Sequence, residues 1–174
     1  MIGTILANLL RFVVLILLQA LVVDHMDLAH GWLVPYPYVL CLLMLPLNTA
    51  LWAALFIGFG TGMVMDHFSS TPGLHAGACT LMAYARHLAL RALAPREGYE
   101  QGRRASITDM GPAWFMTYAG ILVVIHHLWL FNMEVFRFSG FLATLLRALV
   151  SAAGTMVMVL LSQLLIARSG LRTR

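Results

Sequence analysis

The chain has 174 residues, of which 61% are hydrophobic and only 10% are charged. Soluble domains carry about 25% charged residues, and a soluble fold of this length could not bury so much apolar surface. The composition therefore excludes a soluble domain and predicts that most of the chain lies in lipid. The net charge of +4 does not indicate nucleic-acid binding, because the basic residues form no stripe with interleaved aromatic side chains.

Apolar segments that approach the length of a membrane-crossing helix, about 20 residues, recur along the whole chain. In chain order they are 4–23, 36–47, 49–65, 74–93, 113–131 and 140–167. The first is longer than a signal-peptide core and no small-residue cleavage site follows it, so we expect it to be retained. The second would rise only about 18 Å as a helix, so it either extends toward Val34 or crosses only in part. The sequence predicts an all-α membrane protein, a single domain over 1–174 with six transmembrane helices in one bundle.

Charged residues are distributed unevenly between the predicted loops. If the N-terminus is cytoplasmic, the outer loops contain one arginine, Arg137, and four acidic residues. Excess arginine on the cytoplasmic side is typical of membrane proteins. We therefore expect a multi-pass membrane protein with both termini in the cytoplasm. The arginines on the predicted cytoplasmic side are Arg96, Arg103, Arg104, Arg168, Arg172 and Arg174.

Glycines line the third predicted helix and open the fourth. Gly58 and Gly62 are four residues apart, a spacing that allows another helix backbone to approach closely. Gly73 and Gly77 repeat this spacing after a short turn, and Gly60 lies between the first pair. We interpret these five glycines as a packing surface, either within the bundle or toward a partner. The alternative is that glycine is simply frequent in membrane helices.

Several polar residues fall in or beside the outer half of the predicted bundle. Asp66 ends the third helix, where it is a solvated helix end, a cap for the next helix or the partner of a buried arginine. Arg147 is predicted to pair with Glu134, with Asp66 or with carbonyl groups of a broken helix, because intramembrane charges usually face the bundle interior. Together these residues predict an intramembrane polar network: Asp66, His75, His126, Glu134 and Arg147. Arg86, close to the inner face, is expected to extend its charge toward the interface.

No catalytic, cofactor-binding or metal-binding motif stands out in the sequence. Adjacent helical residues point about 100° apart, so His126 and His127 are poorly placed to share a metal ion. Nothing matches a nucleophile elbow or a phosphate-binding loop. We therefore expect no enzyme activity, cofactor or metal. The long polar loop 94–111 is expected to contact a partner or lipid through Arg96, Arg103 and Arg104.

The order of these motifs resembles the MreD family of rod shape-determining proteins, in its Bacteroidota-type form. The resemblance covers nearly the whole chain, and no single motif is specific by itself. The residues that carry it are the glycine helix ending in Asp66, Thr71-Pro-Gly73-Leu74-His75-Ala76, Pro95-Arg-Glu97-Gly98-Tyr99-Glu100, Ile125-His126-His127, Leu130-Phe131-Asn-Met-Glu134-Val-Phe136 and Leu145-Leu146-Arg147.

This resemblance implies a non-enzymatic inner-membrane scaffold of the cell-elongation complex that supports lateral peptidoglycan synthesis. It implies direct binding of MreC, a protein with one membrane helix, in a complex with RodA, the elongation penicillin-binding protein and MreB. It also implies a fold similar to the substrate-binding subunits of energy-coupling-factor transporters. Since fold does not determine function, the alternative function is a solute-binding subunit of a vitamin-type transporter.

Overall fold

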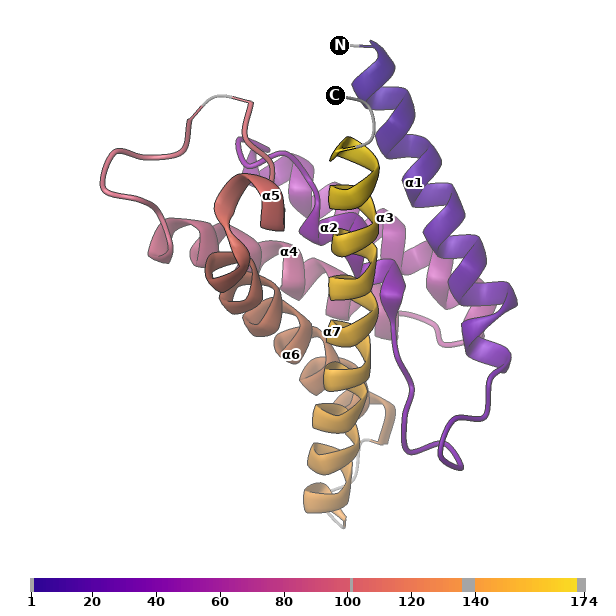
Figure 1. Cartoon of the computed structure of the whole chain (residues 1–174). Coiled ribbons are helices and arrows are strands. Elements are labelled where there is room, and N and C mark those ends of the chain that lie inside the picture. The colour runs from indigo at the N-terminus through magenta and orange to yellow at the C-terminus, as the bar shows by residue number, and fades with distance from the viewer. Residues whose placement is uncertain (1, 101, 136–139, 172–174) are drawn as a thin grey trace.

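The computed structural model describes residues 2–100, 102–135 and 140–171, and in this part of the chain all regular elements are helical (Figure 1). Two 3-10 helices, η1 (Val23–His25) and η2 (Pro37–Val39), accompany the α-helices. The α-helices are α1 (Ile2–Leu21), α2 (Leu40–Leu43), α3 (Leu51–Ser69), α4 (Leu74–Ala92), α5 (Ile107–Met110), α6 (Pro112–Val135) and α7 (Phe141–Leu171).

Three described helices are long and apolar enough to cross a membrane, which corrects the prediction of six. They are α3, α6 and the part of α7 from Phe141 to Leu165. The segment 36–47 forms only η2 and α2, so it is far shorter than the roughly 20 residues that a spanning helix needs. Helix α4 is 19 residues long but contains Arg86 and Arg91 as well as two histidines, which lower its hydropathy. An apolar, membrane-protein character is therefore supported, but the six-span count is not.

The short segment of η2 and α2 lies in the centre of the bundle. Tyr38, Val39, Leu42 and Leu43 are fully buried. Side chains of other helices add hydrogen bonds to the backbone of this segment. Arg86 of α4 is only 2% exposed, and its Nη2 donates to the carbonyl oxygens of Leu45 and Pro46, at 2.7 and 3.0 Å. Arg86 therefore does not extend toward the interface, as the sequence suggests, but holds the end of the buried segment.

Helices α3 and α4 form the closest helix pair, and two glycines of α3 explain why. A Cβ added at Gly58 would lie 2.8 Å from the carbonyl oxygen of Cys79, and one at Gly62 would lie 2.4 Å from Cα of Ala76. The two backbones thus touch along this side of α3. Gly77 packs instead against the Trp129 indole of α6, while an added Cβ at Gly60 or Gly73 would meet no atom within 4 Å.

The start of α1 and the end of α7 lie on one side of the molecule. The first turn of α1, the last turn of α7, the loop around residues 95–106 and α5 all gather at the upper end in Figure 1. The 24–35 loop and the start of α7 lie at the opposite end. Arg168 is part of α7 rather than of a loop, and Phe136, Arg137, Arg172 and Arg174 fall outside the described residues.

Candidate functional site

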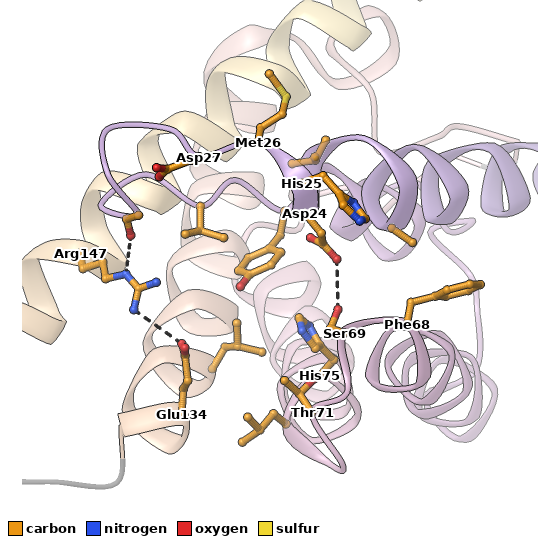
Figure 2. A pocket seen from close by; sticks show the side chains of 17 residues that line it. Asp24, His25, Met26, Asp27, Phe68, Ser69, Thr71, His75, Glu134 and Arg147 are labelled. Atoms are coloured by element: carbon orange, nitrogen blue, oxygen red, sulfur yellow. Dashed lines mark hydrogen bonds and ion pairs between the residues drawn. The ribbon is translucent and has the colours of Figure 1, made fainter.

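A polar pocket of about 550 Å³ opens at the end of the bundle that carries the 24–35 loop (Figure 2). Its walls come from that loop, the α3–α4 turn, the end of α6 and the start of α7. His75, Glu134 and Arg147 of the predicted polar network line it, whereas Asp66 and His126 do not. The other polar lining residues are Asp24, His25, Asp27, Tyr36, Ser69 and Thr71.

Arg147 joins α7 to the 24–35 loop at one side of the pocket. Its Nε donates to the carbonyl oxygen of Gly31 at 2.9 Å, and its Nη1 lies 3.9 Å from a carboxylate oxygen of Glu134 (Figure 2). The guanidinium also lies over the Phe131 ring, 4.8 Å from the centroid, which is a favourable cation–π geometry. Of the predicted partners, Glu134 is therefore present, whereas the bonded carbonyl group belongs to a loop and not to a broken helix.

Arg147 begins a polar stripe along α7 that holds the extended segment before η2. Ser151 and Thr155 follow at intervals of four residues, so all three share one helix face. The Ser151 hydroxyl accepts the backbone N–H of Val34 at 3.0 Å, and the Thr155 hydroxyl accepts that of Tyr36 at 2.9 Å. This stripe therefore holds Val34 and Tyr36, which line the pocket, and the sequence prediction did not include it.

Asp66 caps α4, which is one of the roles predicted for it. It lies in the last turn of α3, and its carboxylate accepts the backbone N–H groups of Gly73, His75 and Ala76 at 2.8 to 3.0 Å. The Thr71 hydroxyl donates to the same carboxylate. An acidic side chain at a helix N-terminus satisfies free N–H groups and complements the helix dipole. The hydrogen bonds of the Asp66 carboxylate therefore stabilise the α3–α4 turn.

Tyr38 connects two of the predicted network histidines in the bundle core. Its hydroxyl lies 2.9 Å from Nδ1 of His75 and 2.8 Å from Nε2 of His126. Since one hydroxyl has one proton to donate, one histidine accepts from Tyr38 and the other donates to it. We infer that His126 is the donor, because its Nδ1 is buried without a partner among the described residues and an unpaired lone pair is less costly than an unpaired N–H.

His126 and His127 have separate partners, as their divergence on the helix predicts. His127 contacts the carbonyl oxygen of Val123 through Nδ1 and the hydroxyl of Thr155 through Nε2, at 2.8 and 2.9 Å. In the described ranges no group of three or more His, Cys, Asp or Glu side chains is placed to hold a metal ion. The histidines thus serve as hydrogen-bonding links between helices.

A second hollow, an apolar groove of about 770 Å³, runs between α3, α4 and α6. Its floor includes the small residues Gly73, Ala76, Gly77 and Thr80, and Trp129 contributes to its wall. The remaining wall residues are Leu55, Phe59, Met63, Leu81 and Tyr84. Small residues beneath exposed large side chains form a surface that another membrane helix can approach closely.

The three arginines expected to make cytoplasmic contacts lie in the 94–111 loop and are exposed. Arg103 pairs with Glu100 at 2.8 Å and donates to the backbone carbonyl of Asp109, so its charge is partly engaged. The loop is held to α4 because the Tyr99 hydroxyl donates to the carbonyl oxygen of Leu90 at 2.7 Å. Burial raises the pKa of the Tyr99 phenol.

Comparison with protein-family models, curated proteins and solved structures gives no match. Three features of the described residues bear on function: a polar pocket at one end, an apolar groove along one side, and a buried hydrogen-bond network that links the helices.

Proposed function

We propose that this protein is a non-enzymatic scaffold of the bacterial inner membrane that binds MreC within the cell-elongation complex. In this complex it would act beside RodA, the elongation penicillin-binding protein and MreB to support lateral peptidoglycan synthesis and cell shape. Both chain ends and the 94–111 loop, with Arg96 and Arg104, would face the cytoplasm. The motif resemblance supports the choice of partners, and the apolar groove supports a docking position for one of them.

The apolar groove between α3, α4 and α6 is the observation that carries the proposal. The face of α3 that carries Gly58 and Gly62 packs against α4, so it is not available to a partner helix. Of the small residues in the groove, Gly73 is exposed and Gly77 and Thr80 are partly exposed. They lie beside Phe59, Met63 and Tyr84, which are about half exposed. Association between membrane helices depends on close packing rather than on the hydrophobic effect. We therefore propose that the single membrane helix of MreC packs in this groove.

Filling the groove tests this placement. Thr80→Phe adds a large side chain at the groove floor, and we expect it to reduce the MreC that co-purifies in detergent by about tenfold, equivalent to about 1.4 kcal/mol of binding. Gly120→Leu is the matched control, because an added Cβ at Gly120 of α6 meets no atom within 4 Å. It adds apolar bulk to another part of the surface and should leave MreC recovery unchanged.

Both variants are first checked for thermal stability and for a single peak in size-exclusion chromatography. Equal MreC recovery with well-folded Thr80→Phe and Gly120→Leu proteins would refute the groove as the docking site. Failure of the unmodified protein to retain MreC would refute the proposed function itself.

The polar pocket favours a second candidate, a solute-binding subunit of a vitamin-type transporter. At about 550 Å³ the pocket lies within the range of small-molecule sites. It presents Asp24, Glu134 and Arg147 together with His75. Against a solute, Asp24 already accepts from Gln19 and Ser69, at 2.6 and 3.1 Å, and Arg147 is held by Gly31 and Glu134.

Native mass spectrometry of protein purified directly from membranes separates the two candidates. The transporter candidate requires a small-molecule adduct that is lost in Asp27→Asn, a change at a pocket residue that lies apart from the bonded pairs in Figure 2. An adduct-free spectrum together with retained MreC supports the scaffold. A stoichiometric adduct that depends on Asp27 supports the transporter subunit.

A further inference from the structure

A third hollow lies at the opposite end of the bundle from the polar pocket. This inner cavity of about 310 Å³ is formed by the 47–49 turn, the start of α3, the last turns of α4 and the following loop. Its polar and charged lining residues are Asn48, Thr49, Arg86, His87, Arg91 and Tyr99. The lining therefore contains two arginines and no carboxylate.

 The polar pocket differs in this respect, because Asp24, Asp27 and Glu134 line it together with Arg147 and two histidines.

Arg86 contributes a buried cation whose hydrogen-bonding capacity is only partly used. Its Nε donates to the Tyr118 hydroxyl at 2.9 Å, and its Nη2 donates to the two carbonyl oxygens of the buried segment. Nη1 makes no hydrogen bond to any residue that the structure describes, although Arg86 lines the cavity. A guanidinium remains charged in proteins and has five N–H donors. The cavity wall therefore has a fixed positive charge with donors to spare.

The N-terminus of α3 meets the same cavity and adds free backbone donors. Its N-cap residue, Ala50, makes no side-chain capping hydrogen bond, and the first turn of the helix has no acidic residue. The Thr49 hydroxyl, which could have capped the helix, donates instead to the Pro46 carbonyl oxygen at 2.7 Å. The first N–H groups of a helix together with its dipole form an anion-binding site.

We propose that the inner cavity binds the phosphate group of an anionic phospholipid, such as phosphatidylglycerol. Arg86 and the α3 N-terminus would hold the phosphate, with Arg91 and His87 at the exposed side of the site. Basic pockets between membrane helices on the cytoplasmic side are suited to anionic headgroups. The same helix ends carry Trp52 and Leu88, which are 69% and 49% exposed and offer an apolar surface to acyl chains. This inference does not depend on the proposed scaffold function.

Lipid titrations followed by native mass spectrometry test the site. The detergent-purified protein is titrated with phosphatidylglycerol and with diacylglycerol, which has the same acyl chains but no phosphate. We expect phosphatidylglycerol to bind at least about tenfold more tightly. The double variant His87→Gln/Arg91→Gln keeps Arg86 in place, so that the buried segment remains held, and should lose most of this preference. Arg96→Gln is the matched control, because Arg96 is an exposed arginine of the adjacent loop that does not line the cavity.

Three results would overturn the inference. Equal binding of the two lipids would exclude phosphate recognition. An equal loss in the double variant and in Arg96→Gln would show that diffuse positive charge attracts the lipid. Displacement of phosphatidylglycerol by millimolar inorganic phosphate, with phosphate taking its place, would identify free phosphate as the ligand rather than lipid.

Discussion

Replacing Gly62 with alanine tests the close contact between α3 and α4 at its tightest point. The added methyl group would lie 2.4 Å from both Cα of Ala76 and the carbonyl oxygen of His75. These are backbone atoms, so no side chain can rotate away, and the two helices must separate. The strain falls beside the α4 N-terminus, where Asp66 accepts the N–H groups of His75 and Ala76. Gly62→Ala is therefore expected to loosen the cap as well as the helix contact.

Gly60→Ala on the same helix isolates the cost of this clash. An added Cβ at Gly60 meets no atom within 4 Å, so this variant should gain about 0.5 to 1 kcal/mol from the better helix propensity of alanine. Gly62→Ala makes the same gain but also overpacks the interface, which typically costs about 1 to 3 kcal/mol. The propensity term cancels between the two variants, and their difference in the free energy of unfolding is the clash itself.

Equilibrium unfolding in mixed micelles, with dodecyl sulfate as the denaturant and tryptophan fluorescence as the signal, measures this difference. We expect Gly60→Ala to be more stable than the unmodified protein, and Gly62→Ala to be less stable than Gly60→Ala by about 1 to 3 kcal/mol. Equal stability of the two variants would refute the argument, because it would mean that the backbones of α3 and α4 do not touch at Gly62.

Three further substitutions test the polar contacts, each by the same unfolding measurement. Asp66→Asn removes the charge at the α4 N-terminus and should cost about 1 to 2 kcal/mol; an unchanged stability would rule out capping. Tyr38→Phe removes the hydroxyl between His75 and His126 and should cost about 1 to 3 kcal/mol, because it leaves buried histidine nitrogens unpaired. Arg86→Gln should cost about 3 kcal/mol or more through the loss of charged hydrogen bonds, and a smaller effect than Tyr38→Phe would contradict its role in holding the buried segment.

The glycine pattern shows how far sequence reasoning reached in the fold. A four-residue spacing predicts that two glycines share a helix face, and Gly58 and Gly62 do share the face that contacts α4. Spacing alone could not say whether α4 or a partner would fill that face, nor that Gly60 and Gly73 would have open space. Which neighbour packs against a helix depends on residues far away in the chain, and no local pattern encodes it.

The polar residues of the predicted network stand out in the sequence, but their hydrogen-bond partners do not. His75, His126, Glu134 and Arg147 stand out because polar groups are costly in lipid. Tyr38, which joins two of them, does not stand out, since a tyrosine near a helix end is usually an interface anchor. The spacing of Arg147, Ser151 and Thr155 was a visible signal of a polar helix face. Its partners, the backbone groups of residues 31–36, emerge only when the short segment is placed in the core.

The sequence by itself determined the environment of this protein and the class of its elements, because hydropathy and helix-length apolar segments are properties of the chain. It also singled out Asp66 as a cap candidate, since an acid four residues past Gly62 stands directly before a turn and a new helix. Only the tertiary structure decided that the second segment is buried rather than spanning, that Arg86 holds its end, and where the polar pocket, the apolar groove and the inner cavity lie. Those outcomes depend on long-range hydrogen bonds, such as Arg86 to Leu45 across 41 positions of the chain, which form only when distant segments meet.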